Sequence, residues 1–286
     1  MNGHIVLVSN PFRDEGLHAA FRCAALLREQ GFSAVVSPIF AEKYEGTLLS
    51  SEAQVPLQEA VEGAGLMVTF GGDGTLLQAA QFMKDRELPL LGVNLGHKGF
   101  LTELSAEEID LLPSALLSGY TLQPRMMLHA ELLRRGEVIL AGDALNDITV
   151  NGIVNTIRLA AYGDGEPIME FGGDGIIVAT PTGATAYSLS AGGPLMEPDA
   201  ENILITPICA HTLTARCFVL SPKRKVMVRP VDLGERKAVF SIDGSEPVAL
   251  EDGDTILVER SPHFVHMVKL PGKGFYETVY EKLSDR

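Results

Sequence analysis

The sequence predicts an α/β N-terminal domain with a mainly parallel sheet, followed by a mainly β C-terminal domain. Up to about residue 123, short apolar runs alternate with segments of helical periodicity, which is typical of a parallel sheet covered by helices. Beyond Pro124 the apolar runs are short, β-rich and separated by turn residues. We therefore expect an α/β domain over 1–123 and a β-rich domain over 124–273. We expect the helical segment 274–286 to pack back on the first domain.

The N-terminal elements follow from the spacing of apolar residues. The run HIVLVS is continuously apolar, as in a strand buried on both faces, and residues 15–30 carry apolar residues at helical spacing before Gly31 ends the helix. By the same criteria we expect strands at 4–9, 34–36, 66–70 and 88–93, and helices at 15–30, 76–83 and 106–117.

The C-terminal strands are predicted from short β-rich runs and from the turn residues between them. Two strand-like runs flank Arg135-Gly136, and RLAAYGDGEPIMEF has the pattern of a second hairpin. Further β-rich runs are CFVLSP, KVMVRPV, KAVFSIDG, DTILVERS and FVHMVKL. Only residues 182–192 have the pattern of a helix within this half.

Bulk composition excludes several classes of protein. The formal net charge is −14 and the only compact basic run is 223–225, so we expect no nucleic-acid partner. No run of about 18 apolar residues occurs, so we expect no membrane span. The three cysteines lack CxxC spacing and the first residues lack a basic signal region, so we expect a cytoplasmic protein without a disulfide framework.

Glycine is the unusual residue of this sequence. The chain has 29 glycines in 286 residues, and 16 of them lie within 63–99 or 163–193. Glycine at that density in folded segments indicates backbone that approaches something closely, or backbone at positive φ.

The first glycine window contains strand–GGDGT–helix. Neither a P-loop nor a GxGxxG fingerprint is present. Instead, Gly71, Gly72, Gly74 and Thr75 could form a backbone nest for phosphate at the start of a helix. Asp73 inside such a nest fits binding of Mg²⁺ or removal of a proton from an attacking hydroxyl. The alternative is a tight turn whose Asp caps the next helix.

The second window, 174–194, combines an acidic turn, an apolar strand and a loop rich in threonine and serine. Six hydroxyl groups fall within eleven residues, and Gly183 and Ala184 leave room for a flat group. Hydroxyls and amides on a close-fitting surface suit a nucleotide base and ribose. A solvated Ser/Thr loop is the alternative.

A third segment, ALNDITV, places Asn146 and Asp147 in an otherwise apolar run. Buried polar side chains need partners, which ligand hydroxyls could supply. A hairpin turn is the alternative. Asp243 in SIDG is interpreted first as a hairpin-turn residue, with proximity to the ligand as the alternative.

These segments, in this order, resemble the NAD kinase family. The resemblance rests on GGDGT at 71–75, NLGHKGFL at 94–101, LND at 145–147, DG at 174–175 and TPTGATAYSLSAGGP at 180–194. GGDGT alone is shared with diacylglycerol and sphingosine kinases and with phosphofructokinases. In the NAD kinase family an α/β domain and a β-rich domain enclose the dinucleotide.

The resemblance implies transfer of the γ-phosphate of ATP to the 2′-hydroxyl of the adenosine ribose of NAD, with Mg²⁺ or another divalent cation. It implies that Asp73 is the proton acceptor or organises the metal, although it leaves the metal ligands unknown. The NAD-binding residues that it implies are Asp73, Gly74, Asn146, Asp147, Asp174, Thr185, Ala186, Tyr187, Ser188, Leu189 and Ser190. At Asp147 the family more often has Glu.

The resemblance also implies a homodimer or homotetramer. Two other functions remain open at this point. A diacylglycerol- or sphingosine-type lipid kinase would share GGDGT, but it predicts a basic or apolar membrane-facing surface that a net charge of −14 does not favour. A non-catalytic dinucleotide-sensing protein would be expected to carry damage at Asp73 or around it, and the motif is intact.

Overall fold

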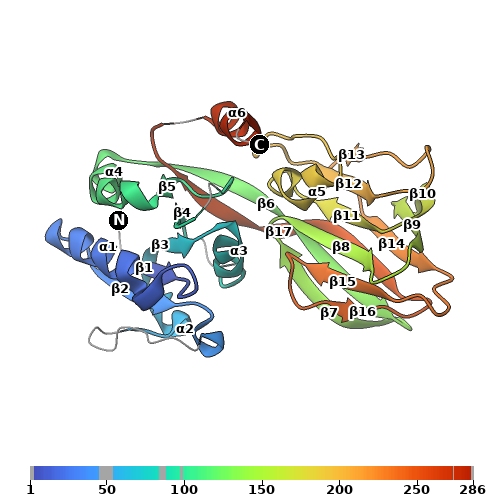
Figure 1. The fold of residues 1–286 in the computed structure, drawn as a ribbon, viewed down its shortest axis with the longest axis horizontal. Helices are drawn as coiled ribbons and strands as arrows, with labels where there is room; N and C mark the ends of the chain where they lie inside the picture. The colour runs from blue at the N-terminus through green and yellow to red at the C-terminus, as the bar shows by residue number, and fades with distance from the viewer. Residues whose placement is uncertain (1–2, 45–53, 84–87, 97–98, 273, 285–286) are drawn as a thin grey trace. The chain divides into compact units, whose positions relative to one another are not determined.

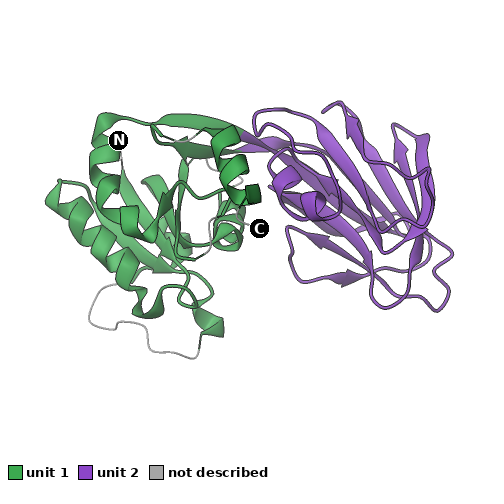
Figure 2. Ribbon diagram, turned by 45° about the horizontal axis from the view of Figure 1, so that its top comes forward, with its two compact units in different colours: residues 1–124, 265–286 green, residues 125–264 purple. Residues whose placement is uncertain are grey.

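The computed structural model describes residues 3–44, 54–83, 88–96, 99–272 and 274–284. The chain divides into two units, which Figure 2 colours separately. Unit 1 comprises Met1–Pro124 and Val265–Arg286, and unit 2 comprises Arg125–Phe264. The predicted α/β and mainly β organisation is confirmed.

Unit 1 is built on a parallel sheet in the order β2-β1-β3-β4. The strands are β1 (His4–Ser9), β2 (Ala34–Pro38), β3 (Ala64–Gly71), β4 (Leu90–Asn94) and the short β5 (Leu104–Ser105), which pairs with β4 (Figure 1). The helical segments are η1 (Glu15–Leu17), α1 (His18–Glu29), η2 (Ala41–Lys43), α2 (Leu57–Ala60), α3 (Asp73–Gln81), η3 (Ala106–Leu111), α4 (Leu112–Ser118) and α6 (Phe275–Ser284). The core joins β1, β3 and β4 to α1, η3 and α4, because all these elements contribute buried apolar side chains to one cluster.

Two helices of unit 1 depart from the expectation of continuous segments. The helix expected over 15–30 is broken at Gly16 and Leu17, where φ is 64° and 58°. Asp14 explains the break, because its carboxylate accepts hydrogen bonds from the backbone N–H groups of Ala19 and Ala20 and so caps α1 from outside the helix.

The helix expected over 106–117 is also divided, into η3 and α4. Pro113 lies in the first turn of α4, where its missing N–H costs nothing. Ser105 and Glu108 form a capping box at the start of η3. The proline therefore begins the second helical segment instead of interrupting one long helix.

Unit 2 contains two groups of strands that share one core. One group runs β10-β9-β14-β17, with β6 paired to β17 and β7 paired to β6; the other runs β13-β12-β11-β8-β15-β16. Their bounds are β6 (Thr121–Arg134), β7 (Glu137–Ala144), β8 (Asp147–Gly152), β9 (Ile157–Gly163), β10 (Glu166–Gly173), β11 (Gly175–Ala179), β12 (Ile203–Ile208), β13 (Phe218–Leu220), β14 (Val226–Val231), β15 (Ala238–Ile242), β16 (Val248–Ala249) and β17 (Thr255–Lys269). Buried apolar side chains from both groups form a single cluster, as in a β-sandwich.

Both expected hairpins are present, and their turns explain the sequence. Arg135 and Gly136 have φ of 54° and 86°, and Asp164 and Gly165 have 51° and 86°. Two consecutive residues at positive φ are what a two-residue hairpin turn requires. The helix expected within 182–192 is reduced to two single turns, η4 (Gly183–Thr185) and α5 (Tyr187–Ser190).

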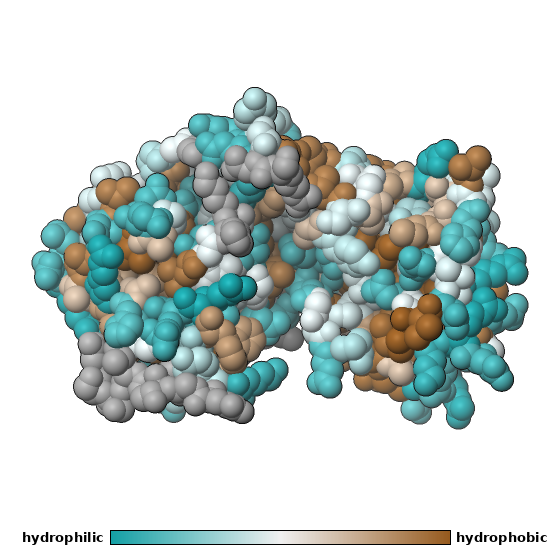
Figure 3. Space-filling model, viewed as in Figure 1, coloured by the Kyte–Doolittle hydropathy of each residue, from teal (hydrophilic) through white to brown (hydrophobic). Residues whose placement is uncertain are grey.

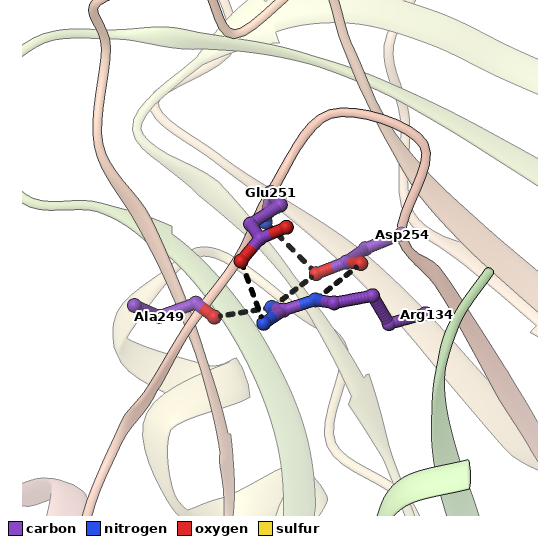
Figure 4. A network of polar contacts seen from close by, with 4 residues as sticks. All are labelled: Arg134, Ala249, Glu251 and Asp254. Carbon is purple, nitrogen blue, oxygen red and sulfur yellow. Dashed lines mark hydrogen bonds and ion pairs between the residues drawn. The ribbon is translucent and has the colours of Figure 1, made fainter. Parts of the chain in front are cut away.

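A partly buried ion pair ties strand β6 to the turn before β17 (Figure 4). Nε and Nη2 of Arg134 donate to the two carboxylate oxygens of Asp254 at 2.9 and 2.8 Å, and Nη2 also donates to the carbonyl of Ala249 at 2.8 Å. Glu251 lies 2.9 Å from Nη1. The Asp254 side chain is only 1% exposed, so Arg134 is the cation that makes its burial tolerable.

On the face drawn in Figure 3, hydrophobic residues are interspersed with hydrophilic ones. Among the helices of the described ranges, none has both the length and the apolar character needed to cross a bilayer.

Candidate active site

The GGDGT segment lies where β3 meets α3. Strand β3 ends at Gly71, Gly72 has extended backbone with φ of −117°, and α3 begins at Asp73. None of the three glycines in this segment has positive φ. The backbone amides of this turn that could bind phosphate are therefore those at the N-terminus of α3.

The glycines of this turn have two different environments. A Cβ on Gly71 would lie 2.2 Å from Oγ1 of Thr75, so only glycine fits beside that hydroxyl. Asn10, at the end of β1, fixes the same hydroxyl by donating from Nδ2 at 3.0 Å. By contrast, a Cβ on Gly72 or Gly74 would meet no atom within 4 Å. The chain leaves open space beside the helix N-terminus at those two positions.

The carboxylate of Asp73 is held by a segment 26 residues further along the chain. The N–H of Phe100 donates to Oδ2 at 2.7 Å, and the N–H of Leu101 donates to Oδ1 at 3.2 Å. Gly99 makes this approach possible, because a Cβ there would lie 2.0 Å from Oδ1. Asp73 is the first residue of α3 and not its N-cap, and the orientation of its carboxylate is fixed by two amides of another segment.

In unit 2, the polar residues of ALNDITV lie at the start of β8. Asp147 is the first residue of β8, whereas Asn146 lies just before it and not within a strand. Strand β11 pairs antiparallel with β8, so Asp147 lies opposite Ala179 at the end of β11. The TPTG loop leaves β11 at this point, which places it beside residues 145–147.

The TPTG loop is bonded directly to the segment before β8. Thr180 donates its N–H to the carbonyl of Asn146 at 2.9 Å and its hydroxyl to the carbonyl of Leu145 at 2.5 Å. Its hydroxyl also accepts the N–H of Gly183 at 3.0 Å. A Cβ on Gly183 would lie 2.1 Å from the carbonyl oxygen of Asn146. Thr180 therefore bonds the TPTG loop to residues 145–146, and Gly183 leaves the space that this close backbone contact requires.

Asn146 and Asp147 are buried polar residues, and one of their side-chain oxygen atoms lacks a hydrogen-bond partner. They are 8% and 7% exposed, and Oδ1 of Asn146 has no hydrogen-bond partner. Burial, and after it the negative charge of Asp243, raises the pKa of Asp147 from 3.8 to about 7. A buried acceptor without a donor is expensive, and a ligand hydroxyl would satisfy it.

Two other residues implied in unit 2 differ in position. The register of β8 and β11 puts Asp174 beside Asn151 and Gly152, at the other end of these strands from Asp147. Burial is the main cause that raises the pKa of Tyr187 above its ordinary value, and negative charge on Cys209, Asp174 and Asp147 raises it further. The charges of Asp174 and Asp147 therefore both act on Tyr187. Tyr187 is 43% exposed and Asp174 is exposed, so both are accessible to a ligand.

Residues 185–190 differ in what their side chains face. Ser190 is exposed, and Thr185, Ala186 and Leu189 are half-buried. Ser188 is completely buried, and its hydroxyl shares a hydrogen bond of 2.8 Å with Thr206. The Ser188 side chain therefore connects α5 to β12.

Sequence reasoning missed two residues that hold the candidate site. Gly99 lies in the first glycine window but was not assigned to the site, and Asp243 was interpreted first as a turn residue. Asp243 accepts the N–H groups of Leu145, Asn146 and Asp147. The glycine count is the signal for Gly99, and the SIDG turn is the signal for Asp243, whose alternative interpretation is proximity to the ligand. Within the described part of the chain, no group of three His, Cys, Asp or Glu side chains could hold a metal ion.

Two family models match the chain and together span most of it. The ATP-NAD kinase N-terminal domain matches residues 5–120, and the ATP-NAD kinase C-terminal domain matches residues 146–270. The NAD kinase of Ruminiclostridium cellulolyticum is 34% identical over 285 residues, covering 99% of this chain and 98% of that relative. The NAD kinase of Aquifex aeolicus is 42% identical over 221 residues, covering 76% of this chain and 80% of that relative.

Two solved structures of an NADH kinase and an NAD kinase are also similar to this chain. The crystal structure of yeast NADH kinase complexed with NADH is similar with a TM-score of 0.84 and 26% identity, covering 99% of this chain and 88% of that one. An NAD kinase from Archaeoglobus fulgidus in complex with ATP is similar with a TM-score of 0.73 and 25% identity, covering 99% of both chains.

Proposed function

The chain belongs to the NAD kinase family, and from this premise we propose that it transfers the γ-phosphate of ATP to the 2′-hydroxyl of the adenosine ribose of NAD, yielding NADP and ADP. One observation in the structure carries the proposal furthest. Asn146 and Asp147 are buried together, and an amide oxygen without a partner is available for a ribose hydroxyl. An intact Asp73 supports turnover and not binding alone.

We assign the dinucleotide to residues of both glycine-rich segments and of the ALNDITV segment. Asn146 and Asp147 hold the ribose region, and Asp73 and Gly74 line the NAD site. The remaining contacts are assigned to Asp174, Thr185, Ala186, Tyr187, Ser188, Leu189 and Ser190. The accessibility of Asp174, Tyr187 and Ser190 supports a direct role for them, whereas the buried Ser188 hydroxyl supports a contact through its backbone.

The phosphate groups are assigned to the start of α3. Gly72 and Gly74 provide backbone at the N-terminus of α3, where N–H groups and the helix dipole favour negative charge. Of the other two residues of the expected nest, Gly71 ends β3, and the N–H of Thr75 already donates to the carbonyl of Gly72 at 3.0 Å. The open space at Gly72 and Gly74 supports this role, since an added Cβ at either position would occupy it.

Asp73 is proposed to accept the proton of the attacking 2′-hydroxyl. The bond between O2′ and the γ-phosphorus forms while the bond to the β,γ-bridging oxygen breaks, and ADP leaves with that electron pair. The amides of Phe100 and Leu101 orient the carboxylate before the reaction. Such preorganisation removes the need to reorient the base during transfer.

We propose that Mg²⁺ or another divalent cation accompanies ATP. Mg²⁺ is commonly held by one or two carboxylates together with substrate phosphates. In the alternative role that the resemblance implies, Asp73 would hold this ion instead of accepting the proton, and the ion would supply neutralisation of phosphate charge. A cytoplasmic location and a homodimeric or homotetrameric state are further proposals that follow from the family.

A direct assay tests the proposed function. The purified chain is incubated with ATP, Mg²⁺ and NAD, and NADP is measured with an NADP-specific dehydrogenase. NADP formation supports the proposal. Phosphorylation of diacylglycerol or sphingosine under the same conditions would assign the chain to lipid kinases. Binding of NAD without any turnover would indicate a sensing protein.

A further inference from the structure

The carboxylate of Asp243 is bonded to three consecutive backbone amides. Oδ2 accepts the N–H of Leu145 at 2.7 Å, and Oδ1 accepts the N–H groups of Asn146 and Asp147 at 2.8 and 3.0 Å. The N–H of Asp243 donates in return to the carbonyl of Asp147 at 2.9 Å. Hydrogen bonds from N–H groups to a carboxylate are among the stronger ones in proteins.

The position of Asp243 in the fold explains this reach. It directly follows β15, which pairs with β8 so that Ile242 lies opposite Ile148. Asp243 and Gly244 have φ of 48° and 68°, which turns the chain at this point. The side chain thereby caps the start of the neighbouring strand, a contact that a hairpin turn by itself does not require.

Asp243 and Thr180 together hold residues 145–147 from two directions. Thr180 bonds the carbonyls of Leu145 and Asn146, whereas Asp243 bonds the amides of all three residues. These hydrogen bonds all hold the segment 145–147. That segment carries the unpartnered Oδ1 of Asn146 and the buried carboxyl of Asp147. Asp243 is also the charge that, after burial, raises the pKa of Asp147.

We propose that Asp243 is a positioning residue for the dinucleotide, whose carboxylate fixes the backbone of residues 145–147 so that Asn146 and Asp147 face the ligand. The inference rests on the proposed function, because that function assigns these two side chains to NAD. Asp243 itself acts through the segment that it holds.

The test compares Asp243→Asn with Asp243→Glu and with a matched control. Asn keeps the size of the side chain, but one of its acceptor oxygens becomes an NH₂ group that opposes the amides. Glu keeps the carboxylate at a different reach. In Asp252→Asn, the control, a carboxylate of the same unit loses its hydrogen bonds from the N–H groups of Leu233 and Gly234, which lie outside the 145–147 segment.

Two readouts separate positioning from general damage. In Asp243→Asn we expect the amides of residues 145–147 to exchange hydrogen at least about tenfold faster without ligand, while core strands keep wild-type protection. We expect the KM for NAD to rise at least about tenfold while the KM for ATP changes less than about threefold. Asp243→Glu should recover part of both effects, and Asp252→Asn should show neither.

Unchanged exchange at 145–147, or an unchanged KM for NAD, would overturn the proposal. A uniform loss of protection, or equal effects in Asp252→Asn, would overturn it as well, because the role would then be purely structural. If Asp243→Asn does not fold, Asp243→Glu decides by the same readouts. If the wild type forms no NADP, the proposed function fails, whereas hydrogen exchange and calorimetric titration with NAD still test Asp243.

Discussion

A Cβ atom on Gly99 would lie 2.0 Å from the Oδ1 atom of Asp73. This close approach lets the amides of Phe100 and Leu101 reach the carboxylate at 2.7 and 3.2 Å. The residue assigned to proton transfer is therefore oriented by a glycine outside its own motif. Position 99 therefore requires glycine, because any side chain there would collide with the Asp73 carboxylate.

Replacing Gly99 by alanine should displace the Asp73 carboxylate. We expect kcat for NADP formation to fall by about 10²-fold, since misplacement of a catalytic group by about 1 Å has a cost of that order. Steady-state kinetics measure the effect, with circular dichroism as a check of folding. Gly96→Ala is the matched control, because its Cβ would find its nearest neighbour at 4.0 Å. A Gly99→Ala enzyme with wild-type kcat would show that the amide clamp is dispensable.

Replacing Gly183 by alanine should push the TPTG loop away from Asn146. The added Cβ would lie 2.1 Å from a backbone oxygen that cannot rotate away. We expect an increase of about tenfold in the dissociation constant for NAD and a loss of about 1–3 kcal/mol in stability. Calorimetric titration and thermal unfolding measure these quantities. Gly142→Ala serves as the control, because its Cβ would meet only the flexible end of Ile242; equal effects in both variants would contradict the explanation.

Asp147 should make stability depend on pH in a definite direction. Its pKa is raised from 3.8 to about 7, so the folded protein retains a proton that the unfolded chain loses between these values. The stabilisation from this carboxyl is complete below about pH 4 and is lost as the pH rises through 7. The neutral Asp147→Asn variant should therefore gain on the wild type as the pH rises, by up to about 4 kcal/mol at pH 8. Urea unfolding at pH 4, 6 and 8 checks this, and a difference that shrinks with rising pH would refute the assignment.

The Arg134–Asp254 pair should be a main contributor to the stability of unit 2. Arg134→Met leaves the buried Asp254 carboxylate without its cation, which should cost about 3 kcal/mol. Arg158→Met, which breaks an exposed pair with Glu170, should cost less than about 1 kcal/mol. Adding Asp254→Asn to Arg134→Met should recover part of the loss. Equal unfolding midpoints for the two single variants would contradict this ranking.

Much of the fold could be predicted because its signals are local. Continuous apolar runs identified β1 and β3, and the Arg-Gly and Asp-Gly pairs identified two hairpin turns. Strand β17 could not be predicted as one element. Pro262 divides its sequence into two apparent strands, yet β17 continues through that proline, pairing with β14 before it and with β4 after it. Those pairings depend on distant parts of the chain.

The candidate site shows the same division between local and distant information. Asp73 could be identified because it lies in the glycine-rich GGDGT segment that follows an apolar strand. Asn146 and Asp147 could be identified because polar residues that interrupt an apolar run stand out in the sequence. Gly99 and Asp243 contact partners 26 and about 96 residues away, so no local spacing marks them. Such residues position the site, and only the folded backbone shows what they hold.

The turnover of Asp73→Asn tests the central claim most directly. NADP formation from ATP, Mg²⁺ and NAD is measured for the wild type and for this variant, with folding checked by circular dichroism. The account predicts that the wild type forms NADP and that kcat of the variant is lower by at least about 10²-fold, because a positioned base contributes about 10²–10⁴ in rate. Near-normal turnover by a folded Asp73→Asn enzyme would contradict the role assigned to this carboxylate.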